Sequence, residues 1–573
     1  MPPDRLSSMI ALRSTIACAA TLLAIPVFAS TASAQEQPAS RVDSTATLQR
    51  SVLTLVTADA VDRYRADQLL KGVAPGQSLM LRSASSLPSS LWSDDLLWAI
   101  GPIYPQLLSV WNSAIPFSQN NSSMWAGRGV SSRTLLGFKA ETKYASVTFA
   151  PQIVVSENAY WLLNNEFFQP LIPLSYIGRG YTFPYYFFTF PIDQPLSFGP
   201  RRITSFDMGE STALVSAGGA QVGVSNENQW WGPGIRNAIL LSNNAPGFPH
   251  LFARTGRPIR TPIGHLDVRW LVGVLKESRY FDTLSTNNYR SIASIGATLQ
   301  MRWDPNLTIG FGRSVYSTAE KWEDIAWRWG DVWKPASERD PDILEQVLVE
   351  PPLRGGRDQI FSLFARWVFP KSGAEVYGEW GRTVLPTSLA DFLRAPNHTQ
   401  GYTIGMQWRG RAFAGGNVRV QAEVTQLEQS ATFRDGPLGS WYTSSRVLQG
   451  YTNRGQVIGA AIGPGASSQF VGLDYMQPSW QVGAFAGRIR WNEDVHSTFG
   501  FPEYIAYCNH DITIYPGARG AVFTRFGTLS ADISLQNRMN ALFQNSGGCP
   551  NTGRRLDIRN SSLTVKFAPF NPR

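Results

Sequence analysis

Two adjacent tryptophans and several side-chain amides lie close together in residues 226–244, which read NENQWWGPGIRNAILLSNN. Tryptophan carries a large apolar ring that can stack on the C–H face of a sugar, with a polar N–H beside it. Side-chain amides offer both donors and acceptors to sugar hydroxyls, and a guanidinium can meet acidic groups. The segment therefore predicts carbohydrate binding. The candidate contact residues are Asn226, Asn228, Gln229, Trp230, Trp231, Arg236, Asn243 and Asn244.

Other interpretations of this segment remain open. Trp230 and Trp231 are equally consistent with packing, either in a barrel girdle or beside a loop. A glycosidase would need two carboxylates across a sugar, and Glu227 alone does not make such a pair. The sequence contains no HExxH, Walker or GxSxG motif. We therefore expect no catalytic residues, no metal and no cofactor.

The segment resembles the Wzi family of outer-membrane capsule-assembly proteins, which carry a similar WWGPG followed by an apolar run and SNNA. Further similar pieces follow at residues 256–258 (GRP), 378–381 (GEWG) and 451–459 (YTNRGQVIG), so that the resemblance covers most of residues 130–573. It implies a non-enzymatic outer-membrane lectin that helps to assemble or retain a surface polysaccharide. It also implies a barrel of about eighteen strands, with a helical region at its periplasmic end.

The N-terminus and the composition are those of an exported chain. Basic residues, an apolar run and an Ala-Ser-Ala site predict a signal peptide over residues 1–34. The chain has 19 Trp, 31 Phe and 50 Gly with only 16% charged residues, which is typical of a transmembrane β-barrel in the Gram-negative outer membrane. Loss of two arginines and one aspartate with the signal peptide lowers the formal charge from +9 to +8. This basic excess fits an acidic polysaccharide or lipid headgroups. We expect a monomer that contacts capsular polysaccharide and outer-membrane lipid, and no nucleic acid.

Alternating apolar and polar residues predict an all-β fold, an antiparallel barrel over residues 131–573. The clearest hairpins fall at residues 295–311, 402–425 and 471–486, with a tight turn at Asp304-Pro305-Asn306 in the first. Residues 35–130 are expected to form a small helical periplasmic region. Its candidate helices are residues 47–70, 93–100 and 103–111. Two irregular segments, residues 167–202 and the Trp-rich 317–358, are candidate outer loops. The Trp-rich loop either contacts sugars or packs over the barrel mouth.

Charged residues on the face opposite the lipid are expected to point into the lumen. They are Arg302, Arg409, Arg419, Glu375, Glu379 and Glu423. These side chains could line a channel, or they could pair across the lumen and fill it. The sequence therefore leaves two functions open, a polysaccharide-binding lectin and a carbohydrate-selective porin.

Two cysteines remain after removal of the signal peptide, Cys508 and Cys549. Between them the sequence reads as one hairpin, with strands from Ala521 to Phe526 and from Leu529 onwards, so both cysteines should lie at the same rim. Because thiols of exported proteins usually pair, we predict a disulfide between them.

Overall fold

The computed structural model describes much of the chain after the predicted signal peptide. The described residues are 55, 57–86, 98–161, 192–281, 287–319, 321–334, 356–386, 388–430, 439–444, 446–494, 510–541 and 557–569.

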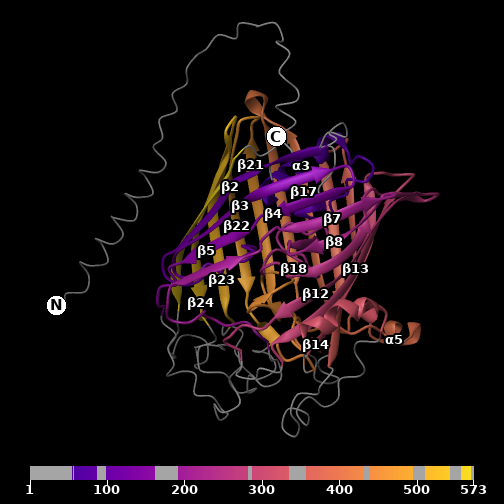
Figure 1. Cartoon of the computed structure of the whole chain (residues 1–573). Helices are drawn as coiled ribbons and strands as arrows, with labels where there is room; N and C mark the ends of the chain where they lie inside the picture. Colours follow the sequence, from indigo (N-terminus) through magenta and orange to yellow (C-terminus); the bar gives the residue numbers. More distant parts are fainter. Residues whose placement is uncertain are drawn as a thin grey trace, which may run out of the picture. The chain divides into compact units, whose positions relative to one another are not determined.

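Within these residues, eighteen antiparallel strands close into a barrel (Figure 1). The ring closes where β2 pairs with β25, from Leu107 opposite Phe567 to Asn112 opposite Ser562. Closure leaves the sheet without a free edge. In order around the barrel, the strands are β2 (Trp98–Asn112), β3 (Gly129–Thr142), β4 (Ala145–Phe149) with β5 (Gln152–Ser156), β6 (Ile203–Asp207) with β7 (Thr212–Ala217), β8 (Ala220–Ser225), β10 (His250–Thr255), β12 (Gly264–Lys276), β13 (Tyr289–Met301), β14 (Leu307–Ala319), β15 (Arg357–Phe369), β16 (Ala374–Arg382), β17 (Gln400–Arg411), β18 (Asn417–Gln426), β21 (Ser467–Met476), β22 (Trp480–Arg490), β23 (Ile512–Thr524), β24 (Gly527–Met539) and β25 (Ile558–Pro569).

The remaining elements are short. They are helix α3 (Ala58–Lys71), helix α5 (Leu389–Arg394), the 3-10 segments η1 (Ala84–Ser86), η4 (Trp322–Trp333) and η5 (Phe413–Gly415), and the small strands β1 (Leu81–Ser83), β9 (Gln229–Trp231), β11 (Ile259–Thr261), β19 (Thr452–Asn453) and β20 (Gln456–Val457). None of the helices in the described part of the chain is long and apolar enough to cross a membrane.

The two ends of the barrel differ in the length of their connections. At one rim β23 joins β24 through residues 525–526, and β13 joins β14 through residues 302–306. At the other rim β14 is followed by β15 only after residues 320–356. We call these the short-turn rim and the long-loop rim. In outer-membrane barrels the short turns are periplasmic and the long loops extracellular.

The predicted hairpins are confirmed, and they follow the alternation in the sequence. In the first, Ala297 lies opposite Phe311 and Leu299 opposite Ile309, with their side chains on the outer face. Ser294 and Ser314 share a hydrogen bond of 2.7 Å on the inner face. The predicted turn is also present, because the Asp304 carboxylate accepts the N–H of Asn306 at 3.0 Å.

The predicted helix over residues 103–111 is wrong, because these residues belong to barrel strand β2. The pairing of β2 with β3 shifts register between Ile103 and Gln106, and the irregularity contains Pro105. A proline cannot donate to a sheet ladder and is tolerated at such a bulge. Of the second predicted helix, residues 93–97 lie outside the described residues, and residues 98–100 form the start of β2. The barrel therefore starts at Trp98 rather than at residue 131.

The first predicted helix is confirmed in part as α3, which begins after the N-cap Thr57. Helix α3 lies inside the barrel toward the short-turn rim (Figure 1), and its charged side chains pair with the wall. Arg65 meets Glu375 at 2.8 Å, and Asp62 meets Arg419 at 2.7 Å. Two further ion pairs join α3 to the wall, Asp59 with Lys566 and Asp67 with Arg409.

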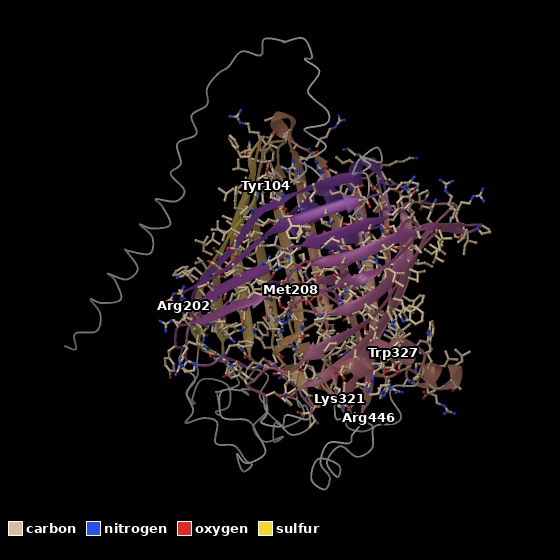
Figure 2. The ribbon with its side chains drawn as sticks, viewed as in Figure 1. Tyr104, Arg202, Met208, Lys321, Trp327 and Arg446 are labelled. Atoms are coloured by element: carbon tan, nitrogen blue, oxygen red, sulfur yellow. The ribbon has the colours of Figure 1, made fainter. Side chains whose placement is uncertain are left out.

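Part of the predicted loop over residues 317–358 forms η4, which packs on the outside of the barrel rather than over its mouth. Ile325 and Val332 of η4 are buried against Ile295 of β13. Trp329 meets Trp270 of β12 edge to face, with ring centroids 5.5 Å apart. Trp327 is 88% exposed on this segment near the long-loop rim (Figure 2). Residues 335–355, and 162–191 of the other predicted loop, lie outside the described residues.

Candidate functional site

The segment that carries the paired tryptophans leaves the wall after β8 and crosses the lumen before it rejoins the wall at β10. Its strand β9 pairs with β1, with Trp231 opposite Leu81 and Gln229 opposite Ser83. Two glycines make the turn that follows. Gly232 has a φ of +121°, which L side chains rarely adopt. A Cβ added to Gly234 would lie 1.9 Å from the carbonyl oxygen of Asn237, so only glycine fits there.

Two carboxylates of the barrel wall hold this segment by its backbone. Glu423 of β18 accepts the N–H groups of Ile235 at 2.7 Å, Arg236 at 3.1 Å and Asn237 at 2.9 Å. Glu379 of β16 accepts the N–H of Ile239 at 3.0 Å. Both glutamates were predicted to face the lumen. They bind the segment instead of lining a channel, and this satisfies backbone groups that would otherwise be buried without partners.

A second segment, residues 439–466 between β18 and β21, packs against the first. The Tyr442 hydroxyl donates to the carbonyl of Ile239 at 2.9 Å, and the Ser242 N–H donates to the carbonyl of Ile458 at 2.8 Å. Trp231, Ile239, Leu240, Tyr442, Tyr451 and Ile458 are fully buried members of one hydrophobic cluster. Residues 378–381 and 451–459, which are far apart in the sequence, thus meet the 226–244 segment inside the barrel.

The structure separates the eight predicted contact residues into two groups. Asn228, Gln229, Trp230, Arg236 and Asn243 line a lumen cavity of about 490 Å³. Trp231 is fully buried, Asn226 donates to Asp207 at 3.2 Å, and Asn244 donates to the carbonyl of Val457 at 2.9 Å. These last three hold the fold of the segment, so the packing interpretation applies to Trp231.

The cavity also exposes residues that the sequence analysis did not single out. Arg82 of β1 stacks on the Trp230 ring, with its guanidinium carbon 4.9 Å from the ring centroid. Arg133 of β3 lines the same cavity and donates to the carbonyl of Asn121 at 3.1 Å. Asn120 and Asn121 form a second pair of side-chain amides in the cavity lining. Their residue types could have indicated them as contact residues in the sequence. Nothing in the local sequence distinguishes Arg82 or Arg133 from other arginines.

Burial and neighbouring cations shape the electrostatics here. Burial lowers the pKa of Arg82 to about 9, and the nearby Arg65 and Arg366 act in the same direction. Burial, followed by Arg519, also lowers the pKa of Arg236. The guanidinium of Arg236 lies over the Phe470 ring, 3.9 Å from its centroid. Both guanidinium groups are half-buried in the cavity wall.

The contacts of Glu227, the one acidic residue beside the two tryptophans in this segment, are structural. The carboxylate of Glu227 is fully buried and accepts the Ser85 N–H at 2.8 Å and the Ser85 hydroxyl at 2.7 Å. It lies 3.8 Å from Arg254. The structure thus uses Glu227 to hold the region near β1. Among the described residues no group of three or more His, Cys, Asp and Glu side chains is arranged to hold a metal ion.

Residues 115–318 match the family model of the capsule assembly protein Wzi. The resemblance inferred from the sequence is confirmed over this stretch, which includes the WWGPG and SNNA pieces. No curated protein matches the chain.

Solved structures similar to the chain have low identity. Escherichia coli Wzi, described as an outer-membrane protein involved in group 1 capsule assembly and a carbohydrate-binding β-barrel, is 10% identical, with a TM-score of 0.49, covering 91% of this chain and 96% of its own. Pseudomonas aeruginosa OccK2 (OpdF) in complex with glucuronate is 9% identical, with a TM-score of 0.36, covering 81% and 97%. Pseudomonas aeruginosa OprD, an outer membrane protein, is 8% identical, with a TM-score of 0.33, covering 81% and 92%.

Proposed function

We propose that this barrel, whose residues 115–318 match the Wzi capsule-assembly family, is a non-enzymatic outer-membrane protein that binds capsular polysaccharide and assists its assembly or attachment. One observation carries the proposal. The amide- and tryptophan-containing segment that bears the resemblance is held by Glu379 and Glu423, and five of its eight predicted contact residues line one cavity. A fixed segment places hydrogen-bonding side chains before a ligand arrives, and this lowers the entropy lost on binding.

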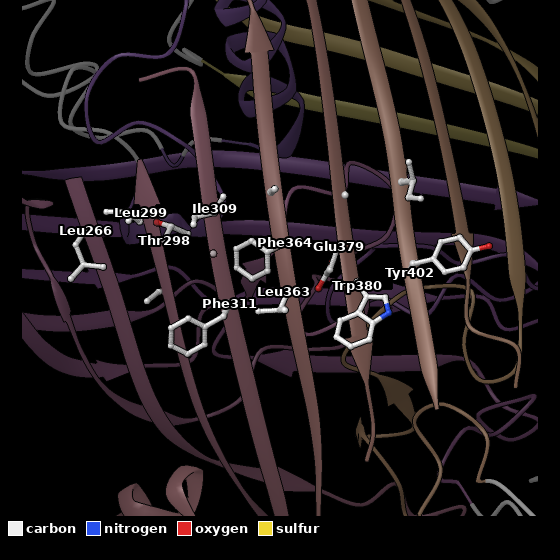
Figure 3. Close-up of a pocket in the computed structure, with 15 residues that line it drawn as sticks. Leu266, Thr298, Leu299, Ile309, Phe311, Leu363, Phe364, Glu379, Trp380 and Tyr402 are labelled. Carbon is white, nitrogen blue, oxygen red and sulfur yellow. The ribbon is translucent and has the colours of Figure 1, made fainter. Parts of the chain in front are cut away.

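The apolar side chains of the outer wall support a location in the lipid bilayer of the outer membrane of a Gram-negative bacterium. An apolar depression of about 770 Å³ lies on β12–β17. Figure 3 shows Leu299, Phe311, Leu363 and Trp380 among the side chains that line it. Apolar side chains on the outer face are what a bilayer requires of a barrel. We propose that the chain works there as a monomer, without nucleic-acid partners.

A carbohydrate-selective porin is the alternative that the sequence left open. The lumen favours the binding protein, because α3 and the two segments 226–249 and 439–466 pack across it with buried aromatic and aliphatic side chains. A porin instead has a polar, water-filled interior. We also propose that the protein is non-enzymatic, which fits the structural use of Glu227.

The proposal can be tested by measuring cell-attached polysaccharide. Cells that lack the chain should shed more capsule than cells that carry it, and the wild-type chain should restore attachment. Asn243→Ala should restore it only in part, since Asn243 lines the cavity and its side-chain oxygen has no hydrogen-bond partner among the described residues. Asn417→Ala, at the first residue of β18 and outside the cavity lining, is the matched control and should restore attachment fully. Equal capsule attachment with and without the chain would refute the proposal.

A further inference from the structure

We infer that Arg82, Arg133 and Arg236 form an anion site in the lumen cavity that binds a carboxylate-bearing sugar reached from the short-turn rim. The inference rests on the proposed polysaccharide binding and adds the class of sugar and the side of entry. It concerns the 490 Å³ cavity alone, which is lined by residues of α3, β1, β2, β3, β5, β18, β21–β25 and the 226–244 segment.

The cavity carries an excess of positive charge. Its basic lining residues are Arg63, Arg65, Arg82, Arg133, Arg236, Arg419, Arg519 and Lys566, and its acidic ones are Asp59, Asp62, Glu210, Glu423 and Asp532. Eight cations therefore face five carboxylates. The net charge of the lining is positive before any ligand is present.

Several of these cations are already neutralised within the protein. Arg419 pairs with Asp62 at 2.7 Å and with Asp474 at 2.9 Å. Arg519 pairs with Asp474 at 2.6 Å. Arg65 pairs with Glu375 and Lys566 with Asp59, each at 2.8 Å.

Arg82, Arg133 and Arg236 differ from this group. Among the described residues, none of the three has a carboxylate within ion-pair distance. Arg82 donates to the carbonyl of Leu79 at 2.9 Å, and Arg133 to that of Asn121. The Nε of Arg236 has no hydrogen-bond partner. The three arginines are half-buried. A partly desolvated cation without a counter-charge costs free energy, and a bound anion would offset that cost.

Neutral groups beside the three arginines favour a sugar over a bare ion. Asn120, Asn228, Gln229 and Asn243 line the cavity beside the arginines. Side-chain amides can exchange hydrogen bonds with sugar hydroxyls, while the guanidinium groups donate charge-assisted hydrogen bonds to a carboxylate. A uronate residue carries both kinds of group on one ring.

The lining also indicates the side of entry. Phe523, Thr528 and Phe567 line the cavity, and they lie at the ends of β23, β24 and β25 that form the short-turn rim. At the other side of the cavity stand the buried residues of the 226–244 and 439–466 segments, including Ile462. A ligand would therefore enter from the periplasmic side of the proposed membrane.

The test is direct binding to the full-length protein in detergent micelles, measured by calorimetry. The probes are oligogalacturonate, the same oligosaccharide with its carboxyls reduced to alcohols, and inorganic phosphate. The variants are Arg82→Gln, Arg133→Gln and Arg236→Gln, singly and combined. Arg302→Gln is the matched control, because Arg302 is exposed at the short-turn rim and does not line the cavity.

Wild-type protein should bind oligogalacturonate at least ten-fold more tightly than its reduced form, and the affinity should fall with salt. Each cavity variant should lose about five- to ten-fold, and the control should lose nothing. Equal binding of both oligosaccharides, or no loss in the triple variant, would overturn the inference. Binding of phosphate with equal affinity would show a general anion site and would also overturn the assignment to a uronate.

Two outcomes separate the inference from the function on which it rests. If purified capsular polysaccharide binds the wild type and the triple variant equally, the polysaccharide-binding function is supported and the anion site is refuted. If capsular polysaccharide binds neither protein, the proposed function is refuted. Entry is tested with fluorescent oligogalacturonate, which should bind cells only after the outer membrane is permeabilised. Equal labelling of intact cells would contradict entry from the short-turn rim.

Discussion

At the scale of single residues, the two adjacent tryptophans have different environments. Successive side chains of a strand point to opposite sides, so β9 directs Trp230 and Trp231 apart. Trp230 lines the cavity under Arg82, while Trp231 is fully buried against the wall. A Cβ added to Gly296 of β13 would lie 3.0 Å from the Trp231 ring. The sequence predicted a sugar contact for both, since residue type alone does not separate a contact from a packing role.

The first prediction concerns this difference. Trp231→Ala should lower the free energy of unfolding by about 3–5 kcal/mol, because it leaves a large cavity among buried neighbours. Trp230→Ala should lower the free energy of unfolding clearly less, since that ring already borders a cavity. The same change should weaken polysaccharide binding. The midpoint of the heat-dependent gel shift measures stability in both variants. A Trp230→Ala midpoint as low as that of Trp231→Ala would show that both rings serve packing.

The second prediction concerns pH. Burial raises the pKa of Asp494 to about 7, although hydrogen bonds from Ser440 and Gln429 act in the opposite direction and nearby Glu428 and Glu493 act with burial. The folded protein therefore holds this proton more tightly than the unfolded chain. The stability from Asp494 is fully present below its unfolded pKa of about 4 and is lost as the pH rises through about 7.

Wild-type protein should consequently lose on the order of 2 kcal/mol more stability between pH 5 and pH 8 than Asp494→Asn. The asparagine keeps an oxygen for the Gln429 N–H and does not titrate. The comparison of the two proteins isolates the contribution of Asp494 from that of every other group they share. Identical pH dependence in both proteins would exclude a role for Asp494.

At the scale of elements, the sequence predicted hairpins well where the alternation is regular and failed where proline or glycine interrupts it. Residues 103–111 contain apolar groups at helical spacing after a proline, yet they form β2, whose bulge accommodates Pro105. Strand β23 begins at Ile512, nine residues before the predicted Ala521. Its pairing with β24 skips from Ile514 to Gly517, around Pro516, which cannot donate to the ladder.

Other elements could not be predicted because tertiary contacts determine them. The segment η4 packs through Ile325 and Val332 onto the outer wall, and no local pattern reveals that partner. Strand alternation predicted that Glu379 and Glu423 point into the lumen. Their hydrogen-bond partners could not be predicted, because the backbone groups that they bind lie 140 or more residues away in the sequence.

The third prediction compares two ion pairs of α3. Arg65 and Glu375 are almost fully buried, whereas Asp67 is 39% exposed in its pair with Arg409. Arg65→Met should lower the free energy of unfolding by about 3–5 kcal/mol, since breaking a buried pair leaves the Glu375 charge without its partner. Asp67→Asn should cost about 0–1 kcal/mol, as exposed pairs do. Thermal unfolding in micelles measures both, and similar losses would show that α3 does not depend on the buried pair.

At the scale of the whole molecule, the fourth prediction concerns conductance. The backbone contacts of Glu423 hold the 226–244 segment across the lumen. Wild-type protein in planar bilayers should therefore show no steady conductance. Glu423→Gln should produce brief openings, because an amide oxygen accepts these N–H groups less strongly than a carboxylate does. Steady conductance by the wild type would favour the porin.

The disulfide between Cys508 and Cys549 remains a prediction, since both cysteines lie outside the described residues. The hairpin between them is confirmed as β23 and β24, joined by a short turn at residues 525–526. Ile512 pairs with Met539 at the opposite end of this hairpin, which is the long-loop rim. Cys508 precedes Ile512 and Cys549 follows Met539, so both chain segments leave the barrel at the same rim.

Two cysteines can bond only when their Cα atoms come within about 7 Å. Segments that leave neighbouring, paired strands can approach that closely, whereas segments at opposite rims cannot. The bond should stabilise the protein by about 2–4 kcal/mol, mainly by restricting the unfolded chain. Mass spectrometry of non-reduced peptides should therefore recover the two cysteines in one linked species. Cys508→Ser should leave Cys549 open to alkylation, and an alkylatable Cys508 in wild-type protein purified from the outer membrane would contradict the bond.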